Sequence, residues 1–300
     1  MSSFFLNHNL RLRIGWKITI TLISFVVLSL LSNLIFTVGY SAYLFSTEKV
    51  GLESPDLLSQ YLQTRPVVMV LILLQAASMV FVVLLFWKVF EKRSIKEIGL
   101  TNPLFYLKEL FSGLVMGFIA MTIVFLVLYL TGQITISLYT VDPSIIGILL
   151  TDFLLFAVVG FNEELFARGY CITLLQESNK RWMIFVVPSL LFSLMHILNP
   201  GLTVLALLNI FLAGILLAYM FIITRNLWMP IGYHITWNYF QGSIFGFRVS
   251  GSEFGGIFHV EQTGANIING GEFGPEGGLV TTAVLALGIL FLIRRNIRNY

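Results

Sequence analysis

Long apolar runs follow one another along most of the chain, and short polar segments separate them. A helix needs roughly 18 or more apolar residues to cross a hydrocarbon core about 30 Å thick. The runs therefore predict eight membrane-spanning helices, at about residues 17–45, 66–90, 109–131, 144–161, 183–198, 202–224, 227–246 and 278–294. Short strands of alternating polarity are not seen in the sequence, so the expected fold is an all-α polytopic helical bundle.

Composition supports an integral membrane protein. Of 300 residues, 57% are hydrophobic and only 11% are charged, whereas soluble domains carry about 25% charged residues. A net charge of +3, dispersed along the chain, gives no reason to expect a nucleic-acid partner. The single cysteine, Cys171, excludes an intrachain disulfide and a cysteine-based metal cluster.

Basic residues predict the orientation of the helices. If eight helices alternate, the base-rich segments all fall on one side, which is expected to be the cytoplasmic side. These segments contain Arg11, Arg13, Lys17, Lys88, Lys92, Arg93, Lys96, Lys108, Arg168, Lys180, Arg181, Arg225, Arg294, Arg295 and Arg298. We therefore expect a multi-pass protein of the plasma (cytoplasmic) membrane with both termini in the cytoplasm.

The first apolar run could be mistaken for a signal peptide, because it follows basic residues. It is too long for one, however, and ends without a small-x-small cleavage site. We expect it to be retained as the first span.

Residues 250–277 are rich in glycine and lack helical periodicity, which predicts a long loop on the non-cytoplasmic side.

Two adjacent acidic residues, Glu163 and Glu164, interrupt the apolar pattern. Ionisable residues near hydrocarbon are energetically unfavourable and usually functional. In a helix, Glu164 and Arg168 would lie at i,i+4 and could form an ion pair, while Glu163 would point about 100° away. This geometry predicts that Glu163 is left available as a general base. The alternative is a salt-bridged cap at a helix end.

Two later runs each carry a histidine with a partner four positions away: Phe192 with His196, and His234 with Asn238. The second pair can direct two hydrogen bonds at one point, as a developing oxyanion requires. Polar residues in bundles also commonly bond between helices, and a lone histidine such as His196 is more often a core residue. Together, however, these side chains match the requirements of peptide hydrolysis by activated water.

The motifs resemble those of the CPBP intramembrane proteases, also called the Abi or type II CAAX prenyl endopeptidase family. The family pattern is E-E-x-x-x-R, F-x-x-x-H and H-x-x-x-N/D on successive helices. This chain has Glu163-Glu164-x-x-x-Arg168, Phe192-x-x-x-His196 and His234-x-x-x-Asn238, in that order. The segments 93–100 and 270–278 also resemble family segments, the latter one common among bacterial members, so a prokaryotic source is expected.

The resemblance implies one membrane domain, with N-terminal transmembrane helices and a cytoplasmic linker over residues 1–108 and a catalytic core over 109–300. It implies an endopeptidase acting on a membrane-associated substrate, in the best-known members a prenylated CAAX-type C-terminus. Carried over by position, Glu163 would be the general base and His196 would hold the water with it. His234 and Asn238 would stabilise the oxyanion. Glu164 and Arg168 would shape the site, and Phe192 would pack near the cavity.

Several alternatives remain open from the sequence. Glu163, His196 and His234 could form an open zinc site, although the H-E-x-x-H spacing is missing; we favour no cofactor. A transporter would spread polar residues over both halves of the chain and contain repeats, which are not visible. A non-catalytic immunity or scaffold protein would be expected to lose motif residues. The expected partners are the lipid bilayer and a membrane-anchored or lipidated peptide or protein.

Overall fold

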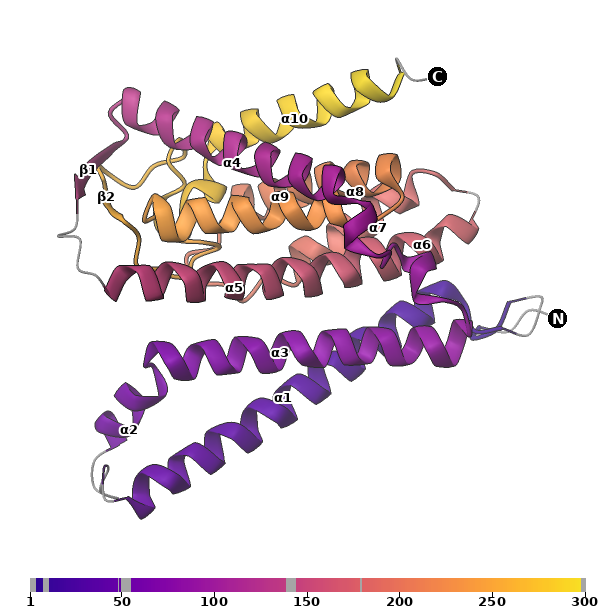
Figure 1. Ribbon diagram of the computed structural model, residues 1–300, viewed down its shortest axis with the longest axis horizontal. Helices are drawn as coiled ribbons and strands as arrows, with labels where there is room; N and C mark the ends of the chain where they lie inside the picture. The colour runs from indigo at the N-terminus through magenta and orange to yellow at the C-terminus, as the bar shows by residue number, and fades with distance from the viewer. Residues whose placement is uncertain are drawn as a thin grey trace. The chain divides into compact units, whose positions relative to one another are not determined.

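The protein is mostly helical (Figure 1). The computed structural model describes residues 4–7, 11–47, 49, 55–138, 144–178 and 180–297, without the side chains of 144, 296 and 297. The chain forms two compact units, Met1–Ser94 and Ile95–Tyr300, and each is considered by itself below.

The first unit is a pair of long apolar helices. It contains α1 (Ile14–Ser46), α2 (Pro55–Leu62), α3 (Arg65–Phe86) and a π-helical turn, Trp87–Glu91. α1 packs against α3. The ammonium group of Lys17 forms a buried ion pair with Glu91, which satisfies both charges. Leu30 and Ile35 of α1 are exposed apolar side chains, as lipid-facing residues are expected to be.

The second unit carries all of the predicted site residues. Its helices are α4 (Leu107–Leu130), α5 (Ser144–Glu164), α6 (Thr173–Leu175), α7 (Met183–Leu194), α8 (Val204–Thr224), α9 (Trp228–Tyr239) and α10 (Leu279–Ile297). π-Helical segments, Leu165–Ile172 and Phe240–Ile244, continue α5 and α9. The 3₁₀ turns are Ile95–Ile98, Pro103–Phe105, Gln176–Ser178, Gly271–Phe273 and Pro275–Gly277.

Small residues allow α4 and α9 to pack closely. A Cβ atom added at Gly113 would lie 2.0 Å from the carbonyl oxygen of Met229, and one at Gly117 would lie 2.3 Å from that of Tyr233. The Thr236 hydroxyl also donates a hydrogen bond of 2.8 Å to the α4 backbone. Glycines four residues apart are a common means of helix association in membranes, and here they fix the position of α9.

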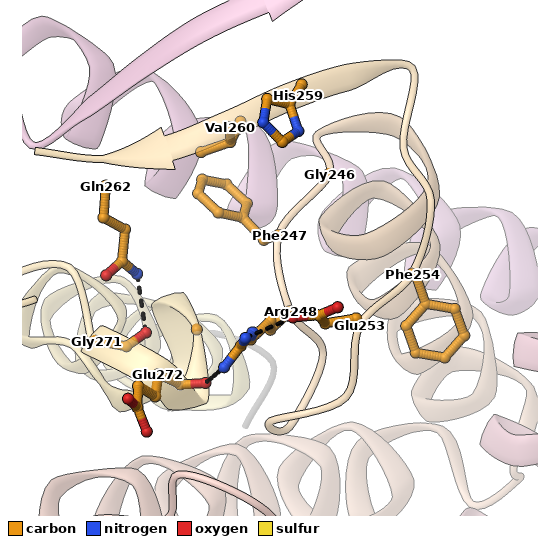
Figure 2. A pocket seen from close by; sticks show the side chains of 11 residues that line it. Gly246, Phe247, Arg248, Glu253, Phe254, His259, Val260, Gln262, Gly271 and Glu272 are labelled. Carbon is orange, nitrogen blue, oxygen red and sulfur yellow. Dashed lines mark hydrogen bonds and ion pairs between the residues drawn. The ribbon is translucent and has the colours of Figure 1, made fainter. Parts of the chain in front are cut away.

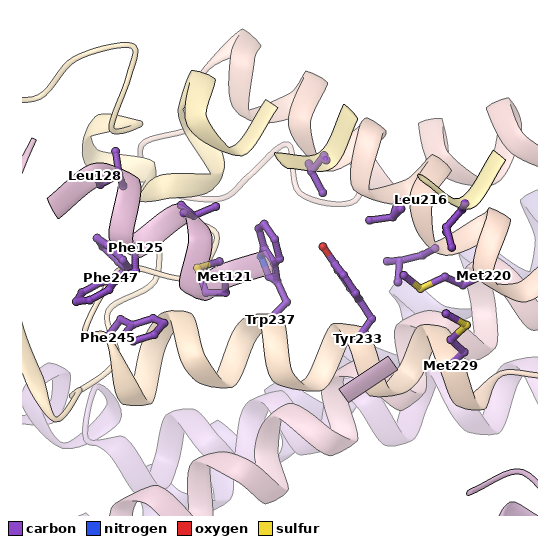
Figure 3. Close-up of a cluster of buried hydrophobic side chains, with 14 of the residues drawn as sticks. Met121, Phe125, Leu128, Leu216, Met220, Met229, Tyr233, Trp237, Phe245 and Phe247 are labelled. Carbon is purple, nitrogen blue, oxygen red and sulfur yellow. The ribbon is translucent and has the colours of Figure 1, made fainter. Parts of the chain in front are cut away.

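The core of this unit lies on one face of α9 (Figure 3). Tyr233 and Trp237 stack with ring centroids 5.8 Å apart, among side chains of α4, α8 and α10. His234 and Asn238 follow them by one residue, so they point about 100° away around the helix. The core therefore holds α9 with His234 facing α5. The two helices are close at this point, because a Cβ atom added at Gly160 of α5 would lie 3.5 Å from the Cβ atom of His234.

Local sequence sets the limits of the shorter helices. α7 ends at Leu194, before the segment Asn-Pro200-Gly201, in which Gly201 has a φ of 68°. The Thr203 side chain caps α8 by accepting a hydrogen bond of 3.1 Å from a backbone N–H three residues later. Arg225 ends α8 in the left-handed conformation, with a φ of 54°.

The prediction of a helical membrane bundle is confirmed, and the protein is a multi-pass membrane protein. The predicted count of eight spans is not. Within the described residues, five helices are long and apolar enough to cross a membrane: Ile14–Ser46, Arg65–Glu91, Leu107–Leu130, Ile145–Ser178 and Val204–Thr224.

Two predicted span boundaries differ clearly from the structure. The span predicted at 144–161 continues to Ser178, because the charged residues that suggested its end are paired inside the protein. The span predicted at 183–198 contains only a 12-residue helix, because its remaining residues form a turn.

A two-stranded antiparallel sheet was not predicted. β1 (Ile134–Leu138) pairs with β2 (Phe258–Gln262), with Ile134 opposite Gln262 and Leu138 opposite Phe258. The helical fold class holds, but these ten residues form a small sheet beside the bundle, and the segment 250–277 is not entirely loop. β1 alternates apolar and polar residues for only five positions, and its partner lies more than 100 residues away. Such pairing depends on tertiary structure more than on local pattern.

Candidate active site

The two glutamates end α5, and the chain continues directly into the π-helical segment Leu165–Ile172. Every residue of that segment is buried, including Arg168. π-Helical turns within longer helices are frequent at functional sites. The two adjacent carboxylates have different environments, because 21% of the Glu163 side chain is exposed whereas that of Glu164 is fully buried.

Glu164 links two helices through one oxygen atom. Its Oε1 accepts hydrogen bonds from Nη1 of Arg168 at 2.8 Å and from Nδ1 of His234 at 2.9 Å. The ion pair predicted between Glu164 and Arg168 is present. The bond to His234 was missed, although a buried carboxylate needs more than one partner. Glu164 therefore fixes the ring of a histidine on α9 as well as a guanidinium on its own helix.

Arg168 is held on three sides. Besides Glu164, it donates from Nη2 to the carbonyl oxygen of Gly214 on α8 at 3.3 Å. Its guanidinium lies 4.4 Å from the ring centroid of Phe192 on α7, within the range of a cation–π interaction. A Cβ added at Gly214 would lie 2.6 Å from the Cβ of Ser189, so the close approach of α7 and α8 brings both contacts to Arg168.

His234 lies between the two glutamates. Its Nδ1 faces Glu164 as described, and its Nε2 is 3.7 Å from Oε2 of Glu163. Because an arginine-paired carboxylate only accepts hydrogen bonds, Nδ1 of His234 carries a proton. Nε2 of His234 is therefore the ring atom directed towards the more exposed carboxylate.

Phe192 brings the second histidine to the same side of the bundle. Its ring centroid is 5.1 Å from that of His196 and 6.0 Å from that of His234, with edge-to-face geometry. His196 follows the end of α7, and its Nδ1 bonds the carbonyl oxygen of Phe192 at 2.8 Å. A carbonyl can only accept, so Nδ1 of His196 carries the proton and Nε2 of the neutral ring is an acceptor.

The remaining contacts among the predicted site residues are indirect. In the described part of the chain, no hydrogen bond or ion pair joins His196 to Glu163 or to Asn238. Asn238 lies one helical turn from His234 on α9 and is 7% exposed. Its carboxamide has no hydrogen-bond partner among the residues that the structure describes. It is therefore available to a ligand at the polar face of α9.

A zinc site does not fit this arrangement. No group of three or more His, Cys, Asp or Glu side chains in the described segments is placed to hold a metal ion. The Nδ1 atoms of both histidines are used in bonds to Glu164 and to the Phe192 backbone, an arrangement that leaves each Nε2 as the ring atom able to bind a metal, so the misfit lies in the placement of the three side chains relative to one another. The alternative ligand set of Glu163, His196 and His234 is not assembled.

A pocket of about 450 Å³ lies elsewhere, between β2 and the glycine-rich loop (Figure 2). Arg248 lies in it, donating to the carbonyl oxygen of Glu272 at 3.1 Å and to a carboxylate oxygen of Glu253. None of the residues predicted from the three motifs lines this pocket. It is therefore separate from the glutamate–histidine cluster.

Comparison with known proteins supports the resemblance carried by the motifs. The family model described as type II CAAX prenyl endopeptidase Rce1-like matches residues 145–240. This segment contains every site residue of the three motifs, from Glu163 to Asn238. No curated protein and no solved structure matches the chain.

Proposed function

We propose that the protein is an intramembrane endopeptidase that hydrolyses a peptide bond of a membrane-anchored or lipidated substrate with an activated water. The arrangement of the two glutamates carries this proposal. Glu164 is fully buried and bound to Arg168 and His234, whereas Glu163 is partly exposed and faces the same histidine. A carboxylate with solvent access beside a rigid polar support is suited to act as a general base.

Glu163 would remove a proton from the attacking water. Nε2 of His196 is an acceptor because Nδ1 is bonded to the backbone, so it can receive the second hydrogen of the same water and orient it. The water oxygen attacks the carbonyl carbon, and the proton held by Glu163 passes to the leaving nitrogen as the C–N bond breaks. The products are a carboxylic acid and an amine.

Asn238 and His234 would stabilise the negative charge on the carbonyl oxygen. Asn238 has an unused carboxamide, and a His234 ring that carries a second proton on Nε2 adds another donor one turn away. With that proton, the cluster contains two carboxylates, one guanidinium and one imidazolium, so its charges cancel. Glu164 then serves to hold the His234 ring in place. Preorganised donors of this kind are usually the largest single contribution to catalysis.

The surroundings of His196 support a substrate that approaches from the lipid. Ile197 and Leu198 follow it directly, and 53% and 92% of their surfaces are exposed. Exposed apolar side chains beside a catalytic turn suit a substrate with an apolar anchor. We also propose cytoplasmic termini, which the basic residues near both ends of the chain support. A prokaryotic plasma membrane is proposed on the family resemblance alone.

The proposal can be tested with purified protein in lipid vesicles. The substrates are two quenched fluorescent peptides with the same sequence, one with a farnesylated CAAX terminus and one with an N-terminal acyl anchor. We expect wild-type protein to cleave at least one, and Glu163→Gln to reduce kcat by about 10²–10⁴-fold. Glu272→Gln, which changes an exposed carboxylate in the glycine-rich loop, is the matched control.

Two results would contradict the proposal. The first is the absence of cleavage of both peptides by folded wild-type protein. The second is a wild-type rate for Glu163→Gln. Inhibition by a zinc chelator, reversed by added zinc, would instead support the metal-dependent alternative.

A further inference from the structure

We infer that Glu276 is a positioning residue, whose carboxylate joins the helix carrying Asn238 to the turn carrying His196. This inference rests on the proposed function, because it assigns a role relative to that site. Glu276 lies in the 3₁₀ turn Pro275–Gly277, outside the segment that the family model matches.

Both oxygens of the Glu276 carboxylate are used. Oε1 accepts a hydrogen bond of 3.2 Å from Nε1 of Trp237 on α9. Oε2 accepts from the backbone N–H of Ser250 at 2.7 Å and from its hydroxyl at 2.9 Å. Ser250 has a φ of 47°, an uncommon conformation for a residue with a Cβ that persists only where surrounding contacts hold it. The carboxylate provides two of those contacts.

The first connection runs to Asn238. Trp237 is its neighbour on α9, and the indole is packed in the core against Tyr233 (Figure 3). A hydrogen bond at the edge of this ring limits rotation and translation of the helical turn. Since Asn238 is on the same turn, the orientation of its carboxamide depends on the same constraint.

The second connection runs to His196. The carbonyl oxygen of Ser250 accepts from Nδ2 of Asn199 at 3.0 Å, and the Asn199 N–H donates to the carbonyl oxygen of His196 at 3.0 Å. The turn after α7 also contacts the loop directly, because a Cβ added at Gly251 would lie 2.0 Å from the carbonyl oxygen of Pro200. Non-helical backbone near hydrocarbon requires such cover from protein.

The loop keeps its place without the carboxylate. The backbone oxygen of Glu276 accepts from Nδ2 of Asn209 on α8 at 2.7 Å, and the oxygen of Gly278 accepts from the same group at 2.9 Å. Gly251 donates its N–H to the carbonyl oxygen of Phe273 at 2.9 Å. A side-chain substitution at Glu276 should therefore leave the loop attached to α8. It should weaken only the hydrogen bonds of the carboxylate to Trp237 and Ser250.

Glu276→Gln tests the inference most directly. The amide keeps one acceptor oxygen and places an N–H₂ group opposite donors, so it cannot satisfy both Trp237 and Ser250. We expect kcat for the better peptide to fall by about 10- to 100-fold, as when reacting groups are displaced slightly, with KM changed less than about twofold. Glu276→Asp, which keeps the charge, should recover part of the loss.

Two further variants separate the connections. Trp237→Phe removes the donor on α9, and Asn199→Ala removes the donor of the turn. If Glu276 acts through Trp237, Trp237→Phe should lower kcat little further in a protein that already carries Glu276→Gln, because interacting residues give non-additive changes. Glu272 is the matched control: it is exposed, and only its backbone oxygen bonds Arg248 (Figure 2). Glu272→Gln should behave as wild type.

Hydrogen exchange provides a readout that does not depend on activity. In Glu276→Gln, peptides covering 195–203 and 248–252 should exchange faster than in wild type and in Glu272→Gln, while α4 remains protected. Wild-type kcat in Glu276→Gln, or a loss shared equally with Glu272→Gln, would overturn the inference. Unchanged exchange in both peptides would overturn it as well. If wild-type protein cleaves neither peptide but exchange responds as expected, the protease proposal fails and the connection through Glu276 stands.

Discussion

Neutralising Glu163 and Glu164 separately should have opposite consequences, although the residues are adjacent and the change is the same. Glu163→Gln should remove activity and preserve stability. Glu164→Gln should lower stability strongly, because its carboxylate is fully buried between Arg168 and His234. A glutamine oxygen in the place of Oε1 could still accept from both donors. The negative charge is lost, however, and the buried guanidinium of Arg168 is left uncompensated.

The size of the effect follows from burial. Removing one member of a buried ion pair costs roughly 3–5 kcal/mol, because the remaining charge is left uncompensated. In a domain of about 150–250 residues, 1 kcal/mol shifts Tm by about 2–4 °C, so Glu164→Gln should lower Tm by about 6–20 °C. Glu163 is partly exposed and paired only loosely, so its substitution should change stability by less than about 1 kcal/mol.

The measurement is thermal unfolding of detergent-solubilised protein, followed by the fraction that remains monodisperse after heating. Cleavage by the same preparations is measured at a temperature where all variants are folded. Adding Arg168→Met to Glu164→Gln removes both charges and should recover part of the lost Tm. Equal Tm values for the two single variants would refute the reasoning, as would a double variant less stable than Glu164→Gln.

Three other changes address packing and chemistry. Arg168→Lys should lower Tm and kcat, because an ammonium group cannot bond Glu164, bond the α8 backbone and stack on an aromatic ring at once; unchanged unfolding and rate would oppose this. Gly117→Ala should destabilise the protein by about 1–3 kcal/mol through overpacking, whereas Gly147→Ala, with open space around it, should be neutral or stabilising in the same unfolding assay. Asn238→Ala should reduce kcat by about 10²–10³-fold with little change in KM, and a change confined to KM would instead indicate a role in substrate binding.

The contacts that could be predicted from the sequence are those between neighbours on one helix. The spacing of Glu164 and Arg168 predicts their ion pair, which is present. The spacing of Phe192 and His196 predicts that they share one helix face, and their rings are in contact. Both pairs are local in sequence, so an approximately helical backbone is enough to bring their members together. The second of these contacts is retained although α7 ends before His196.

Contacts between distant segments were not predicted. Glu164 and His234 are 70 residues apart, and their meeting depends on how close α5 and α9 can pack. The link from Glu276 to Trp237 has the same character. Gly160 allows the close approach of α5 and α9, but a glycine in a sequence does not identify its partner. Helix limits were misplaced where charged residues proved to be buried and paired, as at Glu164.

The short α7 has a consequence for the surrounding membrane. Its 12 residues extend about 18 Å at 1.5 Å per residue, against a hydrocarbon core of about 30 Å. The apolar span Ile145–Ser178, by contrast, has 34 residues, so no single bilayer thickness can match both helices. Where α7 meets lipid, we expect the bilayer to thin or headgroups to move inwards, and either change would shorten the path of water to His196. The acyl-chain length of the host lipids is therefore a physical variable of the reaction, and thinner bilayers should favour hydrolysis.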